Sequence, residues 1–179
     1  LFVSFTAFSQ TTTSQAGAWN SGATWGGSVP TSGTNVVIAH DVTCNSEQTA
    51  GTITVNSGIT LTVNTAGKLT ATGEVTNNGT IVVTSGENAS GSLIATSSSS
   101  FNLTYNLYIP ASEWKLVGIP VSGLTVNDID DNLATNGSKV GIGFYDSETA
   151  SWSVFLSSQT TASISQTRGY EMMHATGDV

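Results

Sequence analysis

The sequence predicts an all-β protein, in which a short-rung right-handed β-solenoid is followed by a partial β-sandwich-like domain. Three observations predict this fold class. Over residues 35–98 apolar side chains alternate with Thr, Asn and Ser, which is the period of a strand with one buried face. Glycine and asparagine turn signals separate these very short strands. Beyond a Ser-rich break at 96–100, aromatic residues become frequent and the expected strands become longer.

Residues 11–34 are expected to form a polar leader and a capping loop ahead of the first strand. The loop contains Trp19 and Trp25 and ends in a region with Pro30 and Gly33. Glycine and proline mark turns, so this segment is expected to deliver the chain into the apolar run at 36–38.

The region 35–98 carries a degenerate repeat. A glycine, a polar residue and an aliphatic residue recur in that order, at uneven spacing, starting at Gly51, Gly67, Gly79 and Gly91. Such a repeat fits a solenoid, in which each strand stacks on its equivalent in the next coil and apolar side chains form an internal column. A β-sandwich gives a similar alternation. The strands are shorter and the turn signals closer than a sandwich usually has, which favours the solenoid.

A second β-domain is expected over residues 101–179. Residues 114–121 read as a strand that Pro120 ends, and 140–145 with 152–156 read as a hairpin across 146–150. Residues 124–133 are the only segment that favours a helix. The final residues 169–174 still have a strand pattern, so the domain is expected to be truncated at its C-terminus.

The charge composition limits the partners. Only 9% of residues are charged, with 4 Lys plus Arg against 12 Asp plus Glu, for a net charge of -8. Such a chain cannot neutralise phosphates and repels nucleic acid and anionic lipid, so we expect no nucleic-acid partner. No run of 18 apolar residues occurs, and no membrane span is expected.

The single cysteine, Cys44, excludes a disulfide within the chain and any zinc cluster built on cysteines. It falls in strand phase with Ile38 and Val42, which predicts a small buried hydrophobic side chain.

Residues 1–10 resemble the remnant of a signal peptide. The run is apolar and then small and polar, and Ala7-Phe8-Ser9 fits the small-x-small pattern before a signal-peptidase cut. We expect a mature chain that begins near Gln10 and a secreted or cell-surface location. An ordinary first strand is the alternative, because the alternating apolar residues would also suit one.

The chain resembles secreted surface proteins of the Bacteroidota that the type IX pathway exports. The first half matches their opening, and the second half looks like the module that precedes their sorting domain. The matching segments are Ala18-Trp19-Asn20, Ala23-Thr24-Trp25, Val29-Pro30, residues 35–38, residues 113–121, Phe144-Tyr145-Asp146, Trp152 and Arg168-Gly169-Tyr170. The first half is also weakly similar to the glycine-rich β-domain of fibrocystin-like proteins. The resemblance implies an adhesin-like scaffold and no assigned catalytic residue.

Four tryptophans are candidates for ligand binding, since flat aromatic faces stack on sugar rings: Trp19, Trp25, Trp114 and Trp152. Each has an alternative role in the core, where an indole ring buries a large apolar area.

Asp128, Asp130 and Asp131 form the densest cluster of oxygen ligands and are the candidate calcium site. The spacing lacks the glycine and closing glutamate of a helix-loop-helix calcium loop, so a solvated acidic turn is the alternative. No other cofactor is expected.

These features favour a non-catalytic secreted or cell-surface interaction protein whose partner is an extracellular glycan or a cell-surface protein. Only two histidines occur, in different expected domains, and no paired carboxylates are evident, so we expect no enzyme. The alternative is the accessory, carbohydrate-binding part of a larger polysaccharide-acting enzyme. A minor alternative is an ice-binding solenoid, because Thr52, Thr54, Thr60, Thr62, Thr70 and Thr72 could stack into a flat hydroxyl-methyl face.

Overall fold

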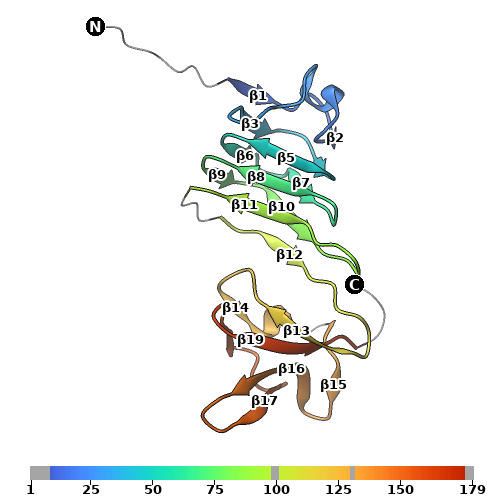
Figure 1. Ribbon diagram of the computed structural model, residues 1–179, viewed down its shortest axis with the longest axis vertical. Coiled ribbons are helices and arrows are strands. Elements are labelled where there is room, and N and C mark those ends of the chain that lie inside the picture. Colours follow the sequence, from blue (N-terminus) through green and yellow to red (C-terminus); the bar gives the residue numbers. More distant parts are fainter. Residues whose placement is uncertain (1–8, 98–100, 130–131, 176–179) are drawn as a thin grey trace, which may run out of the picture. The chain divides into compact units, whose positions relative to one another are not determined.

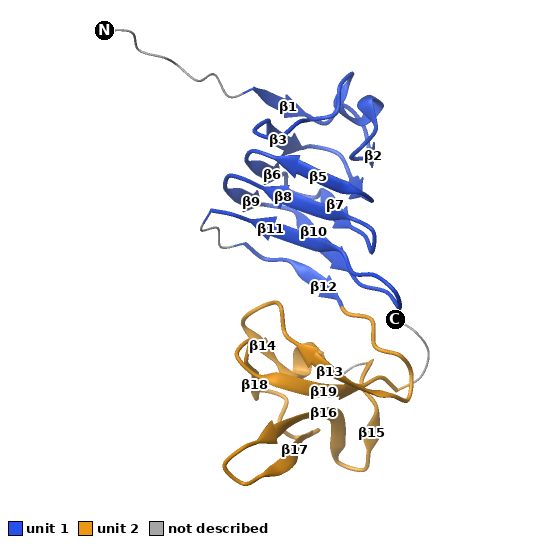
Figure 2. Cartoon of the chain, viewed as in Figure 1, with its two compact units in different colours: residues 1–106 blue, residues 107–179 orange. Residues whose placement is uncertain are grey.

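The computed structural model describes residues 9–97, 101–129 and 132–175. The chain divides into two compact units, residues 1–106 and 107–179, which Figure 2 shows in blue and orange. The division lies beyond the expected start of the second domain at 101, because strand β12 (Thr104–Asn106) still pairs in parallel with strand β10 (Thr80–Thr84).

Unit 1 is a β-solenoid, as predicted, and the structure gives it about four turns. Its strands form three sheets of parallel strands, and Figure 1 shows the strands of successive coils stacked along the unit. The first sheet contains β1 (Gln10–Thr12), β3 (Asn35–Ile38), β6 (Ile53–Val55) and β9 (Val75–Asn77). The second contains β2 (Gly17–Ala18), β4 (Val42–Cys44), β7 (Thr60–Val63), β10 and β12. The third contains β5 (Glu47–Ala50), β8 (Lys68–Ala71) and β11 (Ser92–Ala95). The parallel pairing of successive coils rules out the alternative of an antiparallel sandwich for this unit.

The interior of the solenoid is a column of aliphatic side chains. Each column position repeats from coil to coil, because the parallel register places equivalent residues side by side, as in Val42, Leu61 and Ile81. Ile53, Leu61 and the thiol of Cys44 are fully buried. The alternation in the sequence therefore predicted which side of each strand is buried.

The expected leader and capping loop contribute the first coil. β1 pairs with β3 and β2 pairs with β4, so both strands extend the sheets of the solenoid. Between β2 and β3 a 3-10 turn, η1 (Gly22–Trp25), places Trp25 against Trp19 with the ring centroids 5.0 Å apart. The indole nitrogen of Trp25 donates a hydrogen bond to the carbonyl oxygen of Trp19 at 2.6 Å.

Unit 2 is an antiparallel, curled β-structure with its own core. Its main sheet has the order β13-β19-β16-β15, with β17 also paired to β16, and a separate pair joins β14 to β18. The strands are β13 (Trp114–Gly118), β14 (Leu124–Thr125), β15 (Thr135–Asn136), β16 (Lys139–Asp146), β17 (Ser151–Leu156), β18 (Ser163–Ile164) and β19 (Gly169–Met173). The hairpin of β16 and β17 and the final strand were predicted. Tyr170, Met172, Ile142 and Phe155 are buried in the core.

The expected helix over 124–133 does not form across its described residues. Leu124 and Thr125 pair with β18 as a strand, and a short 3-10 turn, η2 (Val126–Asp128), follows. None of the helices in the described part of the chain is long and apolar enough to cross a membrane.

Candidate binding face

The four candidate tryptophans have two different environments. Trp19 and Trp25 are 0% and 5% exposed, which makes them part of the solenoid core. The expectation that they stack on a ligand is therefore wrong, because no ring face is open to solvent. Trp114 and Trp152 in unit 2 are 44% and 50% exposed.

Trp114 and Trp152 lie on the same face of the main sheet of unit 2. Trp114 pairs with Met173, and Leu116 on the same strand pairs with Glu171. Glu171 in turn pairs with Gly143, and Tyr145, two residues further along β16, pairs with Trp152. Side chains of directly paired residues share a face, and so do residues two apart on one strand. We call this surface the outer face, with exposed apolar side chains from Trp114, Leu116, Tyr145, Trp152 and Leu156.

The opposite face of the same strands packs on the core of unit 2. The intervening residues Tyr170, Met172, Ile142 and Phe155 are all buried there. Strands β16 and β17 thus carry apolar side chains on both faces, and only one of the two faces is covered within the unit. Of the six large hydrophobic side chains that are exposed in the described part of the chain, five belong to the outer face.

Aromatic side chains dominate the outer face. The rings of Tyr145 and Trp152 contact each other edge to face, with centroids 5.7 Å apart. Gly143 lies between the rows of side chains, where an added Cβ would be 2.9 Å from the carbonyl oxygen of Ser153. The rings of Trp114, Tyr145 and Trp152 are each about half exposed, and exposed aromatic rings suit stacking on a flat ligand.

The calcium hypothesis is tested only at Asp128, since Asp130 and Asp131 lie outside the described residues. The Asp128 carboxylate accepts hydrogen bonds from the backbone N–H and the hydroxyl of Thr125, both at 2.7 Å. These two bonds lower the pKa of Asp128. They close a capping box on η2, which gives this carboxylate a structural role. The described residues contain no group of three or more His, Cys, Asp or Glu side chains that could hold a metal ion.

Threonines on the solenoid stack only in pairs. Thr54 pairs with Thr76 and Thr43 with Thr62, but the next positions are Val37 and Val82. Within the described strands no threonine ladder is longer than two residues, so the regular array expected for ice binding does not form.

The fold defines the chain as a β-solenoid protein that carries a second, antiparallel β-unit with an exposed aromatic face. In comparisons with known proteins, no protein-family model, no curated protein and no solved structure matches the chain.

Proposed function

We propose that the chain is a non-catalytic, secreted or cell-surface interaction protein whose second unit binds an extracellular glycan. The solenoid acts as a rigid spacer, and the outer face of unit 2 is the binding surface. The observation that carries the proposal is the concentration of exposed aromatic and aliphatic side chains on that one face. Exposed large apolar side chains gathered on one face of a domain are typical of an interaction site.

A glycan is favoured over a protein partner by the kind of side chain exposed. Trp114, Tyr145 and Trp152 present flat rings, which stack against the apolar faces of pyranose rings while hydroxyl groups stay hydrated. The net charge of -8 disfavours nucleic acid and anionic lipid as partners.

A secreted location is supported by the first residues. Cleavage near Gln10 would remove the apolar run and leave β1 complete, because that strand begins at Gln10. The resemblance to type IX surface proteins of the Bacteroidota agrees with such a location and with an adhesin-like role.

A glycan array probed with the purified chain tests the proposal. We expect retention on a subset of polysaccharides and loss of that retention in a Trp114→Ala, Trp152→Ala double variant. Ile94→Ala is the matched control, because Ile94 is also an exposed hydrophobic residue but lies on the solenoid. Binding that is unchanged in the double variant, or no binding to any glycan, would contradict the proposal.

The second candidate is an accessory, carbohydrate-binding part of a polysaccharide-acting enzyme. The same two exposed tryptophans favour it, since it needs the same binding face. The full coding region of the gene distinguishes the two candidates, because the second one requires a catalytic domain in the same polypeptide.

A further inference from the structure

A pocket opens in unit 2 next to Trp114, where β16 separates from β19. Ile142 and Gly143 of β16 pair with Met172 and Glu171 of β19. At the next residue of β19, Met173, the backbone partner is Ala134 and no longer a residue of β16. The Ala134 N–H donates to the Met173 carbonyl at 2.8 Å, and the Gly141 N–H donates to the Ala134 carbonyl. The strand exchange leaves a cavity of about 310 Å³. This volume is at the lower end of the range of about 300–1,000 Å³ for small-ligand pockets.

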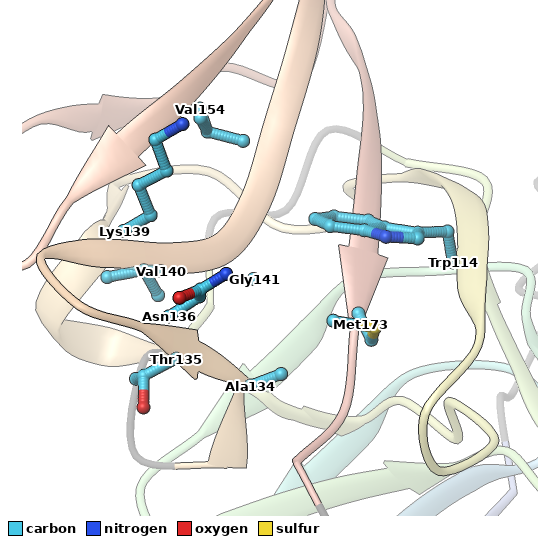
Figure 3. A pocket seen from close by; sticks show the side chains of 9 residues that line it. All are labelled: Trp114, Ala134, Thr135, Asn136, Lys139, Val140, Gly141, Val154 and Met173. Carbon is cyan, nitrogen blue, oxygen red and sulfur yellow. The ribbon is translucent and has the colours of Figure 1, made fainter.

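The walls of the pocket combine one aromatic ring with a few polar groups. In Figure 3 the indole of Trp114 stands on one side, and Lys139, Asn136 and Val154 stand on the other. Val140, Gly141 and Met173 complete a mostly apolar lining. An apolar pocket with a small number of polar groups is the usual form of a small-ligand site.

Lys139 is the cation of unit 2 that its neighbours leave available. Lys115 forms an ion pair with Glu113 at 2.8 Å, and the Arg168 guanidinium lies 4.1 Å from the centre of the Phe144 ring. Within the described residues Lys139 has no ion pair. Lys139 and Trp114 line the same pocket, so an anionic group bound there would meet an unpaired positive charge at short range, although the chain as a whole carries a net charge of -8.

We propose that this pocket binds one hexuronic acid residue of a polysaccharide. The sugar ring stacks on Trp114, its carboxylate pairs with the Lys139 ammonium, and the Asn136 side-chain amide hydrogen-bonds to a ring hydroxyl. The proposal rests on the glycan-binding function proposed above and specifies the class of glycan. A neutral sugar would stack on the same ring but would leave Lys139 without a counter-charge.

Calorimetric titration of the whole chain with oligogalacturonate, and with the same oligomer after reduction of its carboxyl groups, tests this inference. We expect the acidic oligomer to bind about tenfold more tightly than the neutral one, which is the effect of one charge-assisted hydrogen bond. We expect Lys139→Gln to abolish this preference while weak binding of the neutral oligomer persists. Lys115→Gln is the control, because it removes the same charge from a residue outside the pocket.

Trp114 provides the second test of the site. Trp114→Ala is expected to weaken binding of both oligomers by about tenfold or more, and Trp114→Phe to restore part of it, since phenylalanine keeps a stacking face. Near-UV circular dichroism of each variant checks that unit 2 is folded.

Each other outcome overturns a defined part of the argument. Equal binding of both oligomers, lost in Trp114→Ala, would keep glycan binding and reject the acidic specificity. A preference for the acidic oligomer that survives Lys139→Gln but not Lys115→Gln would reject the pocket as its site. No binding of these oligomers, together with retention of neutral glycans on the array, would reject this inference and leave the proposed function intact.

Discussion

The buried and exposed positions of each solenoid strand differ in what they tolerate. Ile53 points into the interior column and is fully buried, whereas its neighbour Thr54 pairs with Val37 and Thr76 on the outside of the coil. A carboxylate at the inner position loses its hydration and finds no counter-charge, at a cost of about 3–5 kcal/mol. That is a large part of the stability of about 5–15 kcal/mol that a domain has.

The first prediction is that Ile53→Asp unfolds the solenoid and Thr54→Asp does not. The thermal melting of both variants, followed by far-UV circular dichroism, measures the difference. Equal melting temperatures for the two variants would contradict the assignment of inner and outer positions.

Cys44 is a packing residue with a protected thiol. The side chain is fully buried and donates to the carbonyl oxygen of Ser46 at 3.2 Å. Burial raises the pKa of this thiol, against the smaller opposite effect of hydrogen bonds to the backbone at Ser46 and Lys68. The folded state therefore retains the thiol proton to higher pH than the unfolded state.

The second prediction concerns the reactivity and pH dependence of Cys44. We expect no reaction with a thiol reagent in the native protein and full reaction in denaturant. Because the folded pKa is raised, the contribution to stability is complete below the ordinary thiol pKa of about 8.5 and is lost as the pH rises beyond it. Denaturant titrations at neutral and alkaline pH, compared with Cys44→Ala, measure this loss; rapid labelling of the native protein would refute the prediction.

Elements of the solenoid depend on glycines at the corners between strands. A Cβ on Gly67 would overlap the carbonyl oxygen of Cys44, and one on Gly79 would overlap the carbonyl oxygens of Asn56 and Ile59. These atoms are backbone groups of the preceding coil, so they cannot move aside without breaking the stack. The repeated glycine in the sequence is therefore a requirement for close approach between coils.

The third prediction is that Gly67→Ala destabilises the solenoid by about 1–3 kcal/mol, the usual effect of overpacking. Gly118→Ala serves as the control, because a Cβ there has no atom within 4 Å. Urea denaturation of both variants gives the comparison. A loss of stability no larger for Gly67→Ala than for Gly118→Ala would show that the corner can relax.

The strands of the solenoid could be predicted from the sequence because each carries its own period-two signal. The number of residues per coil could not be predicted, because the glycines are unevenly spaced. The structure shows the reason, since the coil from Val36 to Ile53 is shorter than the one from Ile53 to Val75. Turns of variable length absorb this difference without moving the inner residues.

The prediction of a helix over 124–133 was wrong because strand pairing with β18 outweighed the local helix propensity. Leu124 and Thr125 satisfy their backbone groups with β18, and Asp128 caps a single turn instead of starting a helix. Short segments of this kind have no clear hydrophobic periodicity, so contacts with the rest of the unit determine their secondary structure.

The outer face was only partly predictable. Trp114 and Trp152 were recognised as candidates, but their exposure depends on which face of each strand meets the core. On β17 the apolar residues Trp152, Val154 and Leu156 lie on the face opposite the buried Phe155, and this alternation was the available signal. Lys139 was missed, since its place in the same pocket as Trp114 follows from the strand exchange at Ala134.

At the scale of the whole molecule, the two units bury separate cores. The solenoid core contains Trp19, Ile38 and Leu61, and the core of unit 2 contains Ile142, Met172 and Tyr170. The two cores also differ in how their strands pair, in parallel in unit 1 and antiparallel in unit 2. Each unit thus has the buried apolar cluster that a cooperative folding unit requires.

The last prediction is that the units unfold in two separate transitions. Calorimetry of the whole chain is expected to resolve two steps, with Ile53→Asp shifting one and Ile142→Asp shifting the other, because each carboxylate enters a different core. Hydrogen exchange measured on peptides from 10–97 and 107–175 assigns each step to its unit. A single transition that both variants shift equally would mean that the chain folds as one cooperative structure, and the binding unit would then depend on the spacer for its stability.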